Sequence, residues 1–159
     1  VLNKVKLFKI NFHPGPPEFP GIGCFNFALD KKSKFYGVTA HEMSKKVDSG
    51  KIIKTRIFKL KKNQNIGNLI DQSYYEMFLL FKEIFLKFKK EKKIEYSKLK
   101  WKKKVYTRKD LEKLCEIKNI KNKNEILNKL RATYYKGYPG PYIKIHGHCF
   151  EYNPRRLKK

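Results

Sequence analysis

Four side chains early in the sequence carry groups that could do chemistry together: the amide of Asn11, the imidazoles of His13 and His41, and the carboxylate of Asp48. An amide N–H can stabilise an oxyanion, and an imidazole gains and loses a proton near neutral pH. A carboxylate can hold an imidazole in its charged form, or accept a proton itself. The set suits a reaction that passes through an oxyanion and moves a proton.

The first two of these residues lie at the end of a predicted strand. Residues Val5 to Phe12 predict a strand, and Pro14 ends it because proline cannot continue a ladder of hydrogen bonds. Asn11 and His13 are two positions apart and therefore project from the same face. We expect His13 at the mouth of the strand, where α/β sheets build their sites.

The positions of His41 and Asp48 depend on two further predicted strands. Residues 35–43 and 51–60 are rich in β-branched and aromatic residues, and the VDSG sequence at 47–50 has the composition of a turn between them. Asp48 then lies in a loop that could fold back over the end of the first strand.

Each residue also has an ordinary structural interpretation. Asn11 could satisfy a turn at the end of a strand, and an aspartate before Ser-Gly is a common turn residue. A half-buried strand histidine usually just finds a hydrogen bond, so the residue pattern by itself favours a structural role for His41.

A family resemblance adds to this pattern. The chain carries NFHP at 11–14, PG at 20–21, GVTAH at 37–41 and VDSG at 47–50. In this order and spacing, these four elements resemble the core of the folate-dependent formyltransferases, the family that includes methionyl-tRNA formyltransferase. The resemblance implies transfer of a formyl group from N10-formyltetrahydrofolate, as cosubstrate and without a metal, to an amine.

The resemblance also implies roles for individual residues. Asn11, His13 and Asp48 would be catalytic, whereas His41 and Gly50 would contribute to the folate site. The residue types agree, because the tetrahedral intermediate of formyl transfer carries charge on oxygen and the attacking amine must lose a proton. The sequence does not separate a role for Asp48 as the partner of an imidazole from a role as the proton acceptor.

One branch of the family fits better than the others. The branches that act on methionyl-tRNA or a purine-pathway ribonucleotide continue His-Pro with Ser-Leu-Leu-Pro, but residues 13–21 read HPGPPEFPG. This loop and the tail at 131–152 are similar to the sugar N-formyltransferases, which formylate a nucleotide-linked amino sugar for the O-antigen of lipopolysaccharide. The branch implies Pro16 and Phe19 as acceptor-site residues and a possible homodimer. Tyr138 and nearby tyrosines could stack on a sugar or base, or form a packing or dimer surface.

The expected fold is α/β. Residues 1–93 are predicted to form the C-terminal portion of a doubly wound, Rossmann-like formyltransferase core, and residues 94–159 a helical and β-hairpin extension. By the resemblance, a strand-helix region precedes Val1, so we expect the chain to belong to a longer protein. The predicted helices are 24–31, 65–90, 107–117 and a short one that begins with Asn124 as its cap; the hairpin turns about Gly147.

The net charge of +25 invites a nucleic-acid interpretation. However, the 39 basic residues include five arginines, and arginine is the residue that reads phosphates and bases in a bidentate way. Lysine enrichment of this kind is typical of AT-rich codon usage, so a nucleic-acid partner is disfavoured. Cys24, Cys115 and Cys149 lack metal-site spacing and predict reduced thiols in a cytoplasmic protein; the sequence contains no membrane span.

Overall fold

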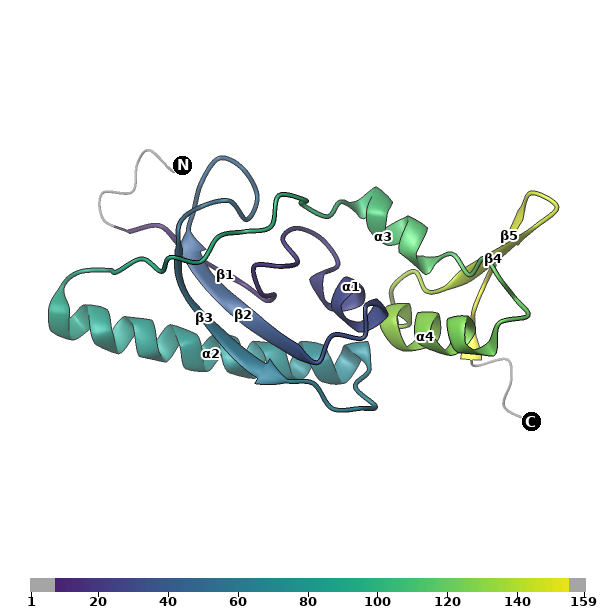
Figure 1. Ribbon diagram of the computed structural model, residues 1–159, viewed down its shortest axis with the longest axis horizontal. Coiled ribbons are helices and arrows are strands. Elements are labelled where there is room, and N and C mark those ends of the chain that lie inside the picture. The colour runs from purple at the N-terminus through teal and green to yellow at the C-terminus, as the bar shows by residue number, and fades with distance from the viewer. Residues whose placement is uncertain (1–7, 155–159) are drawn as a thin grey trace.

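A three-stranded antiparallel sheet with a long helix along one face forms the larger part of the structure, a computed structural model that describes residues 8–154 (Figure 1). The strand order is β1-β2-β3. These elements are β1 (Ile10–His13), β2 (Phe35–Glu42), β3 (Ile52–Lys59) and α2 (Ile66–Glu91). The predicted second and third strands and the long helix are confirmed. The first strand ends at His13, next to Pro14, and residues 5–7 of its predicted range lie outside the described residues.

The two faces of this sheet differ in chemistry. Val38 and Ala40 of β2 are fully buried against Leu80 of α2, with Ile10 and Phe12 of β1 packed around them. Because side chains alternate along a strand, the residues between these positions face the other way. That second face carries the polar side chains of β1 and β2, which are Asn11, His13, Thr39 and His41.

A second core lies around α1 (Cys24–Asp30), which was predicted as a short helix. The ring of Phe27 stacks on Tyr106 with their centroids 3.9 Å apart. The Asn26 side chain donates a 2.8 Å hydrogen bond to the carbonyl of Ala132, which joins α1 to the C-terminal part of the chain.

That C-terminal part holds two helices and a hairpin. Its elements are α3 (Arg108–Cys115), α4 (Lys123–Thr133), β4 (Tyr142–Ile145) and β5 (His148–Glu151). Thr107 and Asp110 form the predicted capping box of α3. The predicted cap of α4 was wrong by two positions: Asn122 is the cap, and its side chain accepts from the backbone N–H groups of Asn124 and Glu125.

The connection between α2 and α3 returns along the sheet (Figure 1). Ser97 donates its backbone N–H to the carbonyl of Ile52 at 2.7 Å, and Lys102 donates to the carbonyl of Pro17 at 2.9 Å. The division at residues 93 and 94 stays a prediction, and these hydrogen bonds cross it. Within residues 8–154, no helix is long and apolar enough to cross a membrane.

Candidate active site

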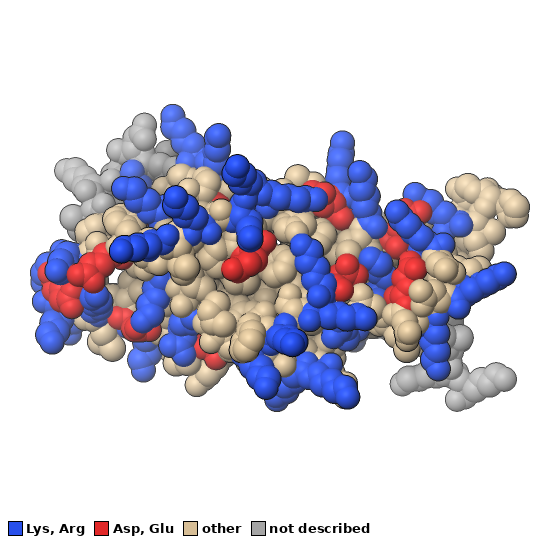
Figure 2. Space-filling model, in the orientation of Figure 1, with Lys and Arg blue, Asp and Glu red and all other residues tan. Residues whose placement is uncertain are grey.

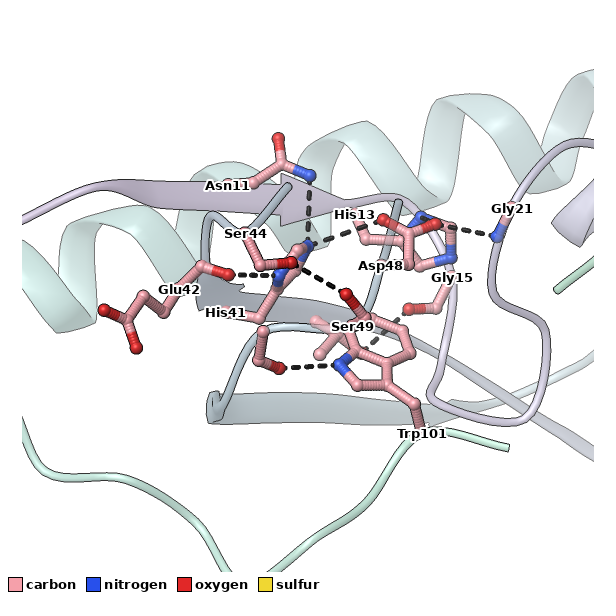
Figure 3. Close-up of polar contacts among 12 residues, drawn as sticks. Asn11, His13, Gly15, Gly21, His41, Glu42, Ser44, Asp48, Ser49 and Trp101 are labelled. Atoms are coloured by element: carbon pink, nitrogen blue, oxygen red, sulfur yellow. Dashed lines mark hydrogen bonds and ion pairs between the residues drawn. The ribbon is translucent and has the colours of Figure 1, made fainter. Parts of the chain in front are cut away.

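The register of β1 and β2 brings the first three polar residues together. Asn11 pairs with His41, and His13 pairs with Thr39, so these side chains share one face of the sheet. The Asn11 Nδ2 atom lies 3.1 Å from Nε2 of His41 (Figure 3). The prediction that Asn11 and His13 project from one face is therefore confirmed.

Asp48 reaches the same place from the loop between β2 and β3, as the turn predicted. Its Oδ2 lies 3.3 Å from Nδ1 of His13, and its Oδ1 lies 3.5 Å from Nε2 of His41. Asp48 has a φ of 41°, a left-handed conformation that aspartate tolerates better than most residues. We call Asn11, His13, His41 and Asp48 the polar cluster.

A backbone N–H fixes the Asp48 carboxylate. The Gly21 nitrogen donates a 2.7 Å hydrogen bond to Oδ2. Gly21 has a φ of 91°, and a Cβ there would collide with the carbonyl of Tyr106, so only glycine fits. The PG element at 20–21 thus supplies an N–H to the polar cluster.

The hydrogen bonds of His41 define its tautomer. Its Nδ1 lies 2.8 Å from the carbonyl oxygen of Glu42, which can only accept, so Nδ1 carries the proton. In the neutral ring, Nε2 is then an acceptor, and it accepts from the Asn11 amide. His41 therefore orients Asn11 with its nitrogen inward and leaves the second N–H of that amide for another acceptor.

Both ring nitrogens of His13 face acceptors. Nε2 lies 3.1 Å from the carbonyl oxygen of Phe19, and Nδ1 faces Asp48. The neutral ring can donate to only one of them, whereas the protonated ring donates to both. Burial nevertheless lowers the pKa of His13 below 6.5, with the Asp48 charge acting against that effect. The arrangement suits an imidazole that is neutral at rest and is stabilised on gaining a proton.

Asp48 is the charged member of the cluster. Burial favours the protonated carboxyl, but the close contact with the His41 ring, the charge of His13 and the Gly21 N–H together outweigh burial and lower the pKa of Asp48 below 3.8. A carboxylate near two imidazoles can stabilise positive charge on either of them.

A tryptophan that the sequence pattern did not place in the site completes it. Trp101 lies in the connection between α2 and α3, and its ring contacts His13 and His41 edge-to-face at centroid distances of 5.5 and 4.9 Å. Its Nε1–H donates a 2.8 Å hydrogen bond to the carbonyl of Gly50. The one feature of the sequence that could have drawn attention to this residue is that Trp101 is the single tryptophan of the chain.

The remaining predicted site residues lie outside the polar cluster, at different distances from it. Gly50 is adjacent, and a Cβ there would collide with the carbonyl of Glu42. Pro16 is buried, and the Phe19 side chain lies in the core, where it packs near Tyr106, so Phe19 meets the cluster through its carbonyl. Tyr138 is exposed in the turn between α4 and β4, apart from the cluster. The acceptor and folate roles of these residues stay predictions.

In the described part of the chain, no group of three or more histidine, cysteine, aspartate or glutamate side chains is arranged to hold a metal ion.

Comparison with solved structures places this arrangement in a known fold. The chain is similar to a 4-N formyltransferase from Francisella tularensis, with a TM-score of 0.79 and 24% identity, over 95% of this chain and 62% of that chain. The chain has the formyltransferase fold. Its likeness extends to an N-formyltransferase from Helicobacter canadensis solved with folinic acid and dTDP-3-aminofucose (TM-score 0.70, 23% identity, 87% of this chain and 51% of that chain).

The same fold is shared with methionyl-tRNA formyltransferase from Clostridium thermocellum, at a TM-score of 0.63 and 19% identity, over 91% of this chain and 61% of that chain. The chain thus spans between 51% and 62% of the length of these three proteins. No protein-family model matches the sequence, and no curated protein matches it. The predicted α/β formyltransferase architecture is confirmed at the level of the fold.

Proposed function

We propose that this chain carries the catalytic residues of an enzyme that transfers a formyl group from N10-formyltetrahydrofolate to the amine of a nucleotide-linked amino sugar. One observation carries the proposal: Asn11, His13 and Asp48, which the sequence motifs single out, lie within hydrogen-bond or ion-pair distance of one another or of His41. The formyltransferase fold around them supports it.

Asn11 is the oxyanion donor in this proposal. Its side chain is exposed, and one amide N–H is directed to His41, so the other is free for a ligand oxygen. When the amine attacks the formyl carbon, the carbonyl oxygen becomes an oxyanion that this N–H stabilises. Such a donor contributes about 2.7–4 kcal/mol in a well-studied case.

His13 and Asp48 handle the proton. Formation of the new C–N bond leaves a proton on the amine, and the neutral His13 or the Asp48 carboxylate accepts it directly or through water. Once protonated, His13 donates to both the Phe19 carbonyl and Asp48. Collapse of the intermediate breaks the bond between the formyl carbon and N10, and N10 takes up a proton, so the formamide and tetrahydrofolate leave.

The cosubstrate and acceptor are proposed from the same relatives. The Helicobacter canadensis protein was solved with folinic acid and dTDP-3-aminofucose, which supports a folate and a nucleotide-linked amino sugar as ligands here. His41 and Gly50 would lie on the folate side, and Pro16, Phe19 and Tyr138 on the acceptor side. A cytoplasmic homodimer that supplies O-antigen biosynthesis belongs to this proposal.

The test is turnover of the full-length protein with N10-formyltetrahydrofolate and dTDP-linked amino sugars. Substitution His13→Ala or Asp48→Ala should lower turnover by about 10²–10⁴-fold, the usual contribution of general acid–base catalysis. Near-normal rates in both variants would contradict the assignment. Formylation of charged initiator tRNA, with no turnover of amino sugars, would instead support the methionyl-tRNA branch.

The surface charge is the one observation that points to the disfavoured alternative, a nucleic-acid binder. Lysine and arginine side chains cover much of the face shown in Figure 2, in keeping with the net charge of +25. A non-catalytic nucleic-acid binder would bind DNA or RNA with a steep dependence on salt. A weak salt dependence, with formyl transfer intact, would exclude it.

A further inference from the structure

Trp101 contacts two residues of the polar cluster, and the proposed formyl transfer assigns this tryptophan no role. Its indole lies against the rings of both His13 and His41, on the side away from Asn11 in Figure 3. Its Nε1–H is bonded to the carbonyl of Gly50, two residues beyond Asp48. One side chain thus contacts both imidazoles and the turn that carries the carboxylate.

The backbone around Trp101 and Gly50 holds the two residues in fixed positions. Gly50 packs so closely against Glu42 that it tolerates no side chain, and the Glu42 carbonyl is the group that fixes the tautomer of His41. Trp101 is itself held in place, because Lys102 beside it donates its backbone N–H to Pro17.

We propose that Trp101 is a positioning residue of the active site, which shields His13 and His41 from water with its ring and fixes the Asp48 turn through the Gly50 carbonyl. The inference rests on the proposed formyl transfer only in assigning the imidazoles a catalytic use.

The shielding has a measurable consequence for His13. The groups that face this imidazole are Asp48 from the turn, His41 from β2 and the Phe19 carbonyl from the loop before α1. Burial outweighs the Asp48 charge and lowers the pKa of His13. If the indole is removed, water reaches the ring and the pKa of His13 should rise toward 6.5.

The experiment is an NMR titration of the histidine ring protons in the wild-type protein, Trp101→Leu and Trp101→Phe. Leucine removes the ring and the N–H, whereas phenylalanine keeps a ring and loses the N–H. The pKa of His13 should rise most in Trp101→Leu and less in Trp101→Phe. Leu99→Ala, an exposed position in the same connection, is the matched control and should leave it unchanged.

Turnover gives a second readout. With a pKa of 6.5, about one quarter of His13 is neutral at pH 6.0, a smaller fraction than in the wild type, where the pKa is lower. Trp101→Leu should therefore lose more turnover at pH 6.0 than at pH 8.0, by up to about fourfold. A purely structural defect would lower turnover equally at both values. An unchanged pKa of His13 in folded Trp101→Leu would overturn the inference.

The wild-type protein provides a test that needs no Trp101 variant to fold. Trp101 is the single tryptophan of the 159 residues, so the emission of this chain reports on this site. Its fluorescence should titrate with the pKa that NMR assigns to His13, and that transition should be lost in His13→Gln. A flat fluorescence titration would contradict the contact. If the NMR and fluorescence results hold but no formyl transfer is found, the proposed function fails and the positioning role stands.

Discussion

His13 and Asp48 form a buried pair, with Nδ1 of the imidazole 3.3 Å from Oδ2 of the carboxylate and both side chains more than nine-tenths buried. The pair joins the end of β1 to a loop far along the chain, and Gly21 anchors the same oxygen. In the proposed reaction, the charge of Asp48 is what matters, because a neutral side chain of the same shape could accept the hydrogen bond from the Gly21 N–H equally well.

The substitution Asp48→Asn separates charge from anchoring. Asparagine tolerates the left-handed backbone and can keep the Gly21 hydrogen bond, but it cannot stabilise a protonated imidazole. We expect turnover to fall by about 10²-fold or more, whereas the melting temperature should fall only moderately, because asparagine keeps the anchor but loses the stabilising charge. Ser49→Ala, at the exposed next position, serves as the control. Full activity in Asp48→Asn would show that the carboxylate acts only as an anchor.

Asn11 and His41 should behave as one unit. Asn11→Ala should lower kcat by about 10²–10³-fold with little change in KM, because in the proposed mechanism the amide acts on the oxyanion. His41→Phe keeps a ring and removes both nitrogens, so Asn11 loses its orientation. If His41 acts through Asn11, the double variant should be no slower than Asn11→Ala. Additive losses in this double-mutant cycle would assign His41 an independent role.

The stability of the protein should depend on pH through His13 and Asp48. The folded pKa of His13 lies below 6.5, so the unfolded chain binds more protons just below that pH and the free energy of unfolding falls as the pH drops through 6.5. The lowered pKa of Asp48 stabilises the fold above 3.8, and this contribution is lost below that pH. Urea unfolding across this range should show both losses, and His13→Gln should remove the first. An identical slope near pH 6 in both proteins would refute the assignment.

Two glycines provide a matched test of the turn. Gly50→Ala puts a methyl group into the carbonyl of Glu42 and should destabilise the protein by about 3 kcal/mol. Gly67→Ala lies in α2, where the nearest atom is 3.5 Å away, and should be neutral or stabilising by up to about 1 kcal/mol. Chemical denaturation measures both. Equal stability in the two variants would mean that the turn relaxes freely.

The sequence was most informative where apolar and polar residues alternate along a strand, or where a side chain caps a helix. The strands at 35–43 and 51–60, the long helix and the capping box of Thr107 all follow local patterns, and the structure confirms them. Local patterns placed the polar side chains at strand ends and in a turn, because these signals are short-range. The expectation that Asn11, His13 and Asp48 act together rested on the resemblance to the formyltransferases as well.

The contributions that were missed are made by backbone or by distant segments. The Phe19 carbonyl acts through a group that every residue carries, so its residue type gives no signal. The PG element marked Gly21, but not that its backbone N–H binds Asp48. The contact of Trp101 depends on the path of a loop with no periodic pattern. Asn122 and Asn124 are both good caps, and only the register of α4 decides between them.

The hydrogen bond between Trp101 and Gly50 spans 51 residues of chain, and its consequence concerns the order of folding. Closing a long loop costs conformational entropy before any contact is gained, so such contacts form later than helical turns. The helix α2 lies entirely inside that loop and can gain its hydrogen bonds first. During refolding, the far-ultraviolet signal of α2 should therefore recover ahead of the Trp101 emission. A chain with its native helix content is not yet a chain with an assembled active site.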